Sequence, residues 1–221
     1  MTEDIPQGDC RSGRPDTSHE EELRRAGYGC VAGLDEAGRG AWAGPVYAGA
    51  VVLPSAPSAL RELLGCVHDS KQLTAEARER AFGLIMDYAR YAGVGVAQAW
   101  EIDELGIARA TRLAWMRALE GLPEAEFLLL DAFPLLESSL PQRPLVRGDS
   151  RCLSIAAASV VAKVARDRHM REQAAGSPVY GFERNKGYGT RQHQEALSEH
   201  GPCSLHRFSF APIRQLADTG L

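Results

Sequence analysis

Apolar residues along the chain follow two spacings, one typical of strands and one typical of helices. Short runs of β-branched and small apolar residues predict strands at 30–36, 46–54, 91–100, 126–132 and 144–149. The run FLLL at 127–130 is apolar at every position, which is typical of a strand buried on both faces.

Helical spacing governs most of the remaining chain. It predicts helices over 74–90, 101–122, 154–172 and from about residue 190 onward. Thr74 is a candidate N-cap of the first helix, and Gly106 divides the second into two pieces. We expect the final segment, 205–213, to trail without a further element. Three strands in succession, followed by alternating helices and strands, predict a layered α/β domain with a mixed sheet.

The first 28 residues differ from the rest of the chain. They are polar, contain Pro6 and Pro15, and show little periodicity. We interpret residues 1–28 as a mostly disordered extension that ends in a short helix at 20–25. The sequence has no internal repeat and no later linker, so residues 29–221 are expected to form one domain around one core.

The composition is that of an ordinary soluble globular protein, with 44% hydrophobic and 24% charged residues. The five cysteines include no C-x-x-C pair, which argues against a disulfide framework or a zinc knuckle and fits a reducing cytoplasm. Three prolines break the longest uncharged stretch, 40–60, so no membrane span is expected. The start MTEDIPQGDC also lacks the features of a secretory signal. We therefore expect a cytoplasmic protein.

Charge is distributed unevenly along the chain. The net charge is −4, but residues 143–191 carry +6, from ten Lys or Arg and four acids. A net negative charge argues weakly against nucleic acid, whereas a local basic region is the feature expected of a phosphate-binding surface. A solvated basic surface without a ligand is the alternative.

Four acids follow or flank the predicted strands: Asp35, Glu36, Asp131 and Asp149. Strand ends that meet in one crevice would bring these carboxylates together, and such like charges are tolerable only around a cation. Oxygen ligands without His or Cys favour Mg²⁺ or Mn²⁺.

Each acid also has a purely structural interpretation. Asp is common in turns after strands, and Asp149 precedes a helix, where it is a good cap candidate. Asp35 and Glu36 are adjacent, and a regular strand sends neighbours to opposite faces. Both can serve one site only if the strand ends or twists there.

Several motifs together carry a resemblance to a known family. They are DEAGRGAWAGP (35–45), DSKQL (69–73), LLLDA (128–132), GDSRCLSIAAASVVAKVARDRHM (148–170), YGFERNKGYGT (180–190) and HRFSFAPI (206–213). In this order they resemble the motifs of the ribonuclease HII family across residues 31–213. One departure is Ala132, where the family often has Gly after its third acid.

The resemblance implies a ribonuclease H-like fold, with a five-stranded mixed sheet flanked by helices and a helical C-terminal part. It implies that Asp35, Glu36, Asp131 and Asp149 hold two divalent ions, Mn²⁺ or Mg²⁺. The implied activity is hydrolysis of the RNA strand of RNA–DNA hybrids, and nicking 5′ of single ribonucleotides embedded in duplex DNA. The products would carry 3′-hydroxyl and 5′-phosphate ends. We expect the protein to act as a monomer on these duplexes.

The resemblance also assigns substrate contacts, to Gly38, Arg39, Gly40, Tyr188, Lys71 and Lys186. Glycines let the backbone approach a ribose, and its N–H and C=O groups can read the 2′-hydroxyl. Further candidates for phosphate contacts are Lys163, Arg166 and Arg184. His169 and His206 are expected to pack or cap rather than bind metal.

The sequence alone leaves other interpretations of these segments open. The glycines could form a turn without function, and Tyr188 could pack on the core. A dinucleotide-binding loop is disfavoured because Gly38, Gly40 and Gly44 have the wrong spacing and lead into a strand. A junction resolvase would lack the G-R-G and the tyrosine, and a type HIII enzyme would need a larger N-terminal domain. A non-catalytic hybrid-binding module would not need all four acids.

Overall fold

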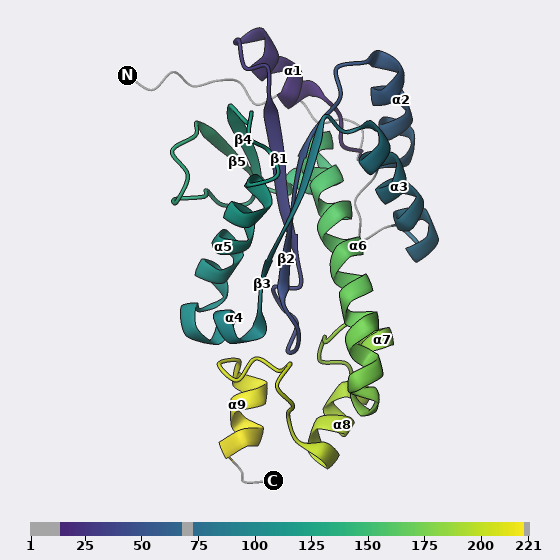
Figure 1. Ribbon diagram of the computed structural model, residues 1–221, viewed down its shortest axis with the longest axis vertical. Coiled ribbons are helices and arrows are strands. Elements are labelled where there is room, and N and C mark those ends of the chain that lie inside the picture. Colours follow the sequence, from purple (N-terminus) through teal and green to yellow (C-terminus); the bar gives the residue numbers. More distant parts are fainter. Residues whose placement is uncertain (1–13, 68–72, 219–221) are drawn as a thin grey trace.

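A computed structural model describes residues 14–67 and 73–218, and its centre is a five-stranded mixed sheet (Figure 1). The strands are β1 (Val31–Ala37), β2 (Val46–Val52), β3 (Tyr91–Ala97), β4 (Phe127–Asp131) and β5 (Gln142–Leu145), in the order β3-β2-β1-β4-β5. Strands β1, β2 and β3 pair antiparallel, whereas β4 is parallel to both β1 and β5. The predicted α/β fold with a mixed sheet is confirmed.

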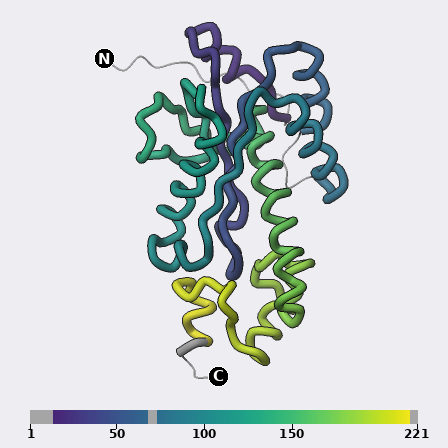
Figure 2. Tube along the Cα trace, viewed as in Figure 1, coloured from purple at the N-terminus to yellow at the C-terminus, as the bar shows by residue number. Residues whose placement is uncertain are grey.

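Helices cover both faces of this sheet (Figure 1). They are α1 (Ser18–Arg25), α2 (Pro57–Cys66), α3 (Ala75–Tyr88), α4 (Ala99–Leu105), α5 (Ile107–Leu119), α6 (Leu153–Gly176), α7 (Phe182–Asn185), α8 (Arg191–His200) and α9 (Ala211–Asp218). Helices α4 and α5 lie on one face, and α6 lies on the other with α2 and α3 outside it. Figure 2 shows α1 and the last helices at opposite ends of the long axis. No helix in the described ranges is long and apolar enough to cross a membrane.

The long helix α6 packs unusually close to the sheet, because both surfaces carry small residues. A Cβ added to Gly33 of β1 would lie 2.2 Å from the backbone of Ser154, and one added to Gly49 of β2 would lie 2.2 Å from the carbonyl oxygen of Ala158. The two strand glycines are therefore a condition of the close fit of α6 against β1 and β2. This contact places the start of α6 against Gly33 of β1, two residues before Asp35.

Most predicted elements are confirmed by the structure. Thr74 caps α3 by accepting a hydrogen bond from the amide of Ala77 at 3.2 Å, and Gly106, with φ +75°, separates α4 from α5. The fifth strand ends earlier than predicted, because Gly148–Ser150 forms a 3₁₀ turn. Helices α2, α7 and α9 were not predicted, and α9 begins at Ala211, within the segment 205–213 that was expected to trail without a further element.

The N-terminal region differs from the expected disordered extension in its second half. Helix α1 covers the predicted short helix, and its Glu20 and Leu23 are buried. The carbonyl of Asp16 accepts a hydrogen bond of 2.8 Å from the amide of Leu153, at the start of α6. Residues 14–28 thus pack on the domain because they bury an apolar side chain and satisfy the first turn of α6. Residues 1–13 lie outside the described part.

Candidate active site

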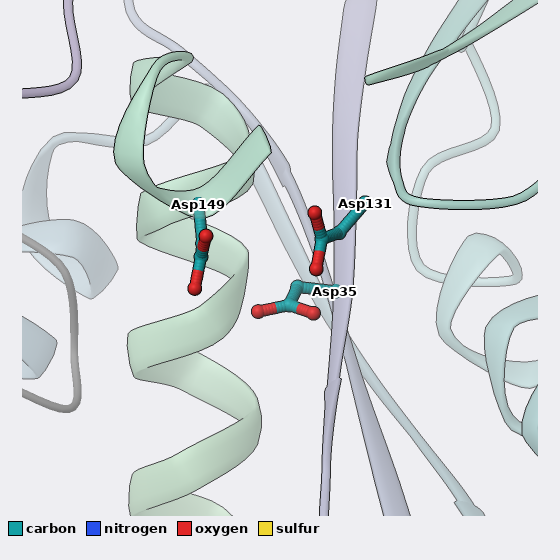
Figure 3. Close-up of side chains that lie close together, drawn as sticks. All are labelled: Asp35, Asp131 and Asp149. Carbon is teal, nitrogen blue, oxygen red and sulfur yellow. The ribbon is translucent and has the colours of Figure 1, made fainter. Parts of the chain in front are cut away.

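Three acids from distant parts of the sequence meet beside the C-terminal end of β4 (Figure 3). Asp35 lies in β1, Asp131 is the last residue of β4, and Asp149 lies in the 3₁₀ turn before α6. One carboxylate oxygen from each lies within 4.8 Å of the other two. The parallel register sets this geometry, since Leu34 pairs with Leu130 and the next residue on each strand is an acid.

Hydrogen bonds hold these carboxylates in place. The Asp35 carboxylate accepts a 2.7 Å bond from the amide of Glu36 and a bond from the Ser159 hydroxyl on α6. Asp131 accepts a 2.7 Å bond from the amide of Gly148, one residue before Asp149. The acid that ends β4 therefore also fixes the turn that presents the third acid.

The electrostatics of this cluster favour a bound cation. Asp35 and Asp149 are each only 5% exposed. Burial raises the pKa of Asp35 well above its usual range, and the neighbouring charges of Glu36 and Asp131 raise it further. A divalent cation would offset both the burial and the repulsion. Because the ligand atoms are all carboxylate oxygens, the site fits a hard ion such as Mg²⁺ or Mn²⁺.

Glu36 is the one predicted ligand that the structure places outside this three-acid group. Strand β1 continues to Ala37, so both adjacent acids lie within the strand, and the three-acid group includes Asp35 without Glu36. The Glu36 carboxylate instead accepts a 3.2 Å hydrogen bond from Arg39. Its charge still acts on the cluster, because it raises the pKa of Asp35.

The predicted ribose-reading glycines follow β1 directly. Gly38 has φ +95° and is buried, and a Cβ there would lie 1.9 Å from Nε of Arg166. Arg39 and Gly40 are exposed, and a Cβ at Gly40 would meet nothing within 4 Å. The loop therefore needs glycine at 38 for packing and conformation, and leaves open space above residue 40.

Tyr188 lies beside this loop, although 150 residues separate it from Gly38. The amide of Trp42 donates a 2.8 Å hydrogen bond to the carbonyl of Gly187, which ties the two segments together. Tyr188 is 37% exposed, and the guanidinium carbon of Arg166 lies 5.3 Å from the centroid of its ring. This exposure argues against the alternative that Tyr188 simply packs on the core.

The basic candidates divide into exposed and buried residues. Lys186 is partly exposed and donates to the carbonyl of Glu183, whereas Lys163 pairs with Asp167 at 2.7 Å and Arg184 pairs with Glu183 at 3.1 Å. Lys71 lies outside the described residues.

Arg166 corrects one of the sequence predictions. It was predicted as a phosphate contact, but it is fully buried and donates to the carbonyls of Ala43 and Pro45. It therefore holds the protein's own backbone. The prediction failed because a basic region in the sequence does not distinguish a surface arginine from one that packs beneath a loop.

The two histidines behave as expected. His169 lies against the ring of Tyr47, with 5.7 Å between the ring centroids, and His206 is 1% exposed. The Nε2 atoms of His206 and His193 lie 3.0 Å apart, and Nδ1 of His193 bonds the carbonyl of Tyr188 at 3.0 Å. Sequence reasoning did not single out His193, for which only its place three residues after the N-cap Thr190 gave a local signal.

Comparisons with known proteins point to one family. The family model described as ribonuclease HII matches residues 32–213. The chain is 54% identical over 200 residues to a ribonuclease HII of Chloroflexus aurantiacus, covering 90% of this chain and 94% of that protein. It is 44% identical over 200 residues to a ribonuclease HII of Bacillus subtilis, covering 90% and 76%.

Solved structures support the same fold. The ribonuclease H2 of Pyrococcus horikoshii superposes with a TM-score of 0.72 at 24% identity, covering 86% of this chain and 98% of that one. A ribonuclease HII of Archaeoglobus fulgidus, solved in complex with PCNA, superposes with a TM-score of 0.70 at 26% identity, covering 84% and 96%.

Proposed function

This chain belongs to the ribonuclease HII family, and from that premise we propose that it nicks duplex DNA on the 5′ side of a single embedded ribonucleotide. As a ribonuclease H it is a hydrolytic endonuclease that acts on RNA–DNA hybrids. One observation carries the finer proposal: the loop at Gly38–Gly40 and the ring of Tyr188 lie side by side, directly after the strand that holds Asp35. So small a surface suits one ribose better than a run of them.

Asp35, Asp131 and Asp149 would hold the divalent ions, with Glu36 as a fourth acid beside them. Bound Mg²⁺ or Mn²⁺ would activate a water and neutralise charge on the phosphate and the leaving 3′ oxygen, giving 3′-hydroxyl and 5′-phosphate ends. The buried carboxylates supply the negative charge for such ions, and their hydrogen bonds fix where that charge lies. The chain needs no nucleophilic side chain for this hydrolysis.

The remaining contacts are assigned by exposure and chemistry. The exposed backbone at Arg39 and Gly40 would read the 2′-hydroxyl, and the Tyr188 ring would pack on the neighbouring sugar. Lys186 would meet a phosphate, and Lys71 keeps this role as a proposal from the sequence. We propose that one copy of the chain performs these contacts on an RNA–DNA hybrid or on DNA with an embedded ribonucleotide.

The test is a cleavage assay on three duplexes that differ only in sugar: one embedded ribonucleotide, no ribonucleotide, and a full RNA strand. With Mg²⁺ or Mn²⁺ we expect a single nick that leaves the ribonucleotide at the 5′ end of the downstream fragment, and no cut in all-DNA duplex. Good cleavage of the hybrid with none at the single ribonucleotide would refute the proposal.

Tyr188 offers a variant series for the same assay. If ring packing on the sugar matters most, Tyr188→Phe should retain most of the activity, and Tyr188→Ala should lose about tenfold or more, in line with a stacking contribution of about 1–3 kcal/mol. Tyr88→Ala, at a similarly exposed tyrosine on α3, is the matched control and should leave cleavage unchanged. Equal rates for wild type and Tyr188→Ala would remove Tyr188 from the site.

A further inference from the structure

A buried arginine lies beneath the loop of residues 38–45, which we call the reading loop. The Arg207 side chain is fully buried, and its guanidinium donates three hydrogen bonds to reading-loop carbonyls. They run to Gly38 at 2.7 Å, to Arg39 at 2.9 Å and to Gly44 at 2.9 Å. A single side chain near the C-terminus thus fixes both ends of a loop that lies more than 160 residues earlier in the sequence.

A second buried guanidinium, that of Arg166, also bonds carbonyls of the reading loop. Arg166 on α6 donates to the carbonyl of Pro45 at 3.0 Å and to the carbonyl of Ala43 at 3.2 Å. It also touches Gly38, where any side chain would collide with it, and it lies under the ring of Tyr188. Arg166 therefore contacts both elements proposed to read the ribose.

Burying two charged guanidinium groups costs free energy, so the arrangement is more than a way to fill space in the core. Neither Arg166 nor Arg207 forms a salt bridge within the described residues, so both cations are buried against neutral carbonyls. Burial lowers the pKa of Arg207 to about 9, and the nearby positive charge of Arg166 adds to this effect. Apolar side chains would fill the same space at lower cost. What apolar side chains cannot do is hold five carbonyls in a fixed direction.

The direction of those carbonyls decides what the loop presents outside. In a trans peptide the C=O and the following N–H point opposite ways. Because the carbonyls of Gly38 and Arg39 turn inward to Arg207, the amides of Arg39 and Gly40 turn outward. In the described part of the chain neither amide donates to another backbone group. The two arginines thus leave a pair of donors facing the space above Gly40.

We propose that Arg166 and Arg207 form a guanidinium clamp that sets the ribose selectivity of the reading loop. The clamp does not touch substrate; it is a positioning device that keeps two amides aimed at a 2′-oxygen and keeps Tyr188 beside them. The Nη1 atom of Arg166 is buried and has no hydrogen-bond partner in the described residues. Arg166 therefore keeps one unused donor beneath the ring of Tyr188. The clamp rests on the proposed function, since it presumes that the loop reads a ribose.

The test measures selectivity in binding rather than cleavage, so that it is independent of metal. Fluorescence anisotropy in EDTA gives the affinity of wild type, Arg207→Lys and Arg166→Lys for a duplex with one ribonucleotide and for the matching all-DNA duplex. Lysine keeps the charge, but its donors sit on a single nitrogen and lack the planar, spread geometry with which a guanidinium reaches separate carbonyls. We expect the ratio of ribonucleotide to all-DNA affinity to fall about tenfold, as for one or two lost hydrogen bonds. The affinity for all-DNA duplex should stay nearly constant.

A matched control is Arg117→Lys on α5, which also bonds a backbone carbonyl, that of Val96, and the carboxylate of Glu101, but does not contact the reading loop. Its ratio should equal that of wild type. Circular dichroism checks the fold of each variant, and Arg166→Lys decides the matter if Arg207→Lys does not fold.

The outcomes separate the clamp from the function on which it rests. A wild-type ratio near one would overturn the proposed ribose reading and the clamp together. A clear wild-type preference that folded Arg207→Lys or Arg166→Lys retains in full would overturn the clamp alone. A smaller ratio with unchanged all-DNA affinity supports it, since general loss of structure would weaken both duplexes alike.

Discussion

Ala132 shows how one residue can carry strain beside the site. It follows Asp131 with φ +64°, a left-handed conformation that is costly for any residue with a Cβ. Its amide is held there by a 2.9 Å hydrogen bond to the carbonyl of Leu145. This explains why the motif that this segment resembles often has Gly at the position, a reason that the sequence alone does not reveal.

We expect Ala132→Gly to raise the free energy of unfolding by about 1 kcal/mol, because glycine adopts this φ without a Cβ clash. Urea denaturation followed by circular dichroism measures the change. Ala108→Gly, in the exposed face of α5, is the control and should lower stability by about 1 kcal/mol. Loss of stability in both variants would mean that the alanine is not strained.

At the acids, the residue-scale prediction concerns ion binding. Asp35→Asn or Asp131→Asn should abolish turnover and weaken Mn²⁺ binding, measured by titration calorimetry, while hybrid binding largely survives. Asp87→Asn, at an exposed acid on α3, should change neither. A site variant that keeps more than about a tenth of the wild-type rate, roughly 1.4 kcal/mol of barrier, would contradict the proposed ligand role.

At the scale of elements, the sequence predicted those helices and strands whose signals are local, such as an N-cap residue or an apolar run. The N-caps Thr74 and Thr190 mark the starts of α3 and α8, and the strand runs mark β1 to β4. The sequence did not predict helix α2, because it begins at Pro57 in a segment that resembles the proline-rich end of a strand. The sequence did not predict the guanidinium clamp for a different reason. Arg207 is polar and its neighbours in the sequence give no sign of burial, and the carbonyls that it bonds are distant in the sequence.

Helix α1 is the element whose role was underestimated. Glu20 is 2% exposed, and its carboxylate accepts hydrogen bonds from the amide of Ser154 at 2.7 Å and from the thiol of Cys152 at 3.1 Å. It therefore caps the first turn of α6 from outside that helix, a few residues after Asp149. An acid at a helix N-terminus also interacts favourably with the helix dipole.

Glu20→Ala should lower the free energy of unfolding by about 1–2 kcal/mol, through a lost cap and an unsatisfied buried amide. Thermal unfolding monitored by circular dichroism provides the measurement. Glu104→Ala at an exposed position of α4 serves as the comparison and should be nearly neutral. Equal stability of the two variants would mean that α1 does not contribute through its cap.

At the scale of the whole molecule, the C-terminal part completes a site that begins in the first strand. The amide of Cys203 donates to Nδ1 of His206 at 2.9 Å, so the neutral ring of His206 carries its proton on Nε2 and donates it to His193. His193 in turn donates from Nδ1 to the carbonyl of Tyr188. This chain of hydrogen bonds runs from the last loop to the tyrosine, and it requires both rings to be neutral.

Stability should therefore decline in mild acid. Burial, followed by the nearby His193, lowers the pKa of His206 from 6.5 to about 4, and burial also lowers the pKa of His193. Between these values the unfolded chain binds a proton that the folded chain does not, so stability falls as the pH drops from about 6.5 and levels off near 4. The loss from His206 is on the order of 3 kcal/mol.

Urea unfolding at half-unit pH steps measures this decline, and comparison between variants cancels the contributions of other titrating groups. His206→Gln removes the titration, so its curve should be flatter between pH 4 and 6.5 although it starts from a lower stability. His200→Gln, at the end of α8 and outside the hydrogen-bonded pair, should keep the wild-type slope. An unchanged slope in His206→Gln would mean that the pair accepts a proton in the folded protein, which is incompatible with two rings that share one hydrogen at 3.0 Å.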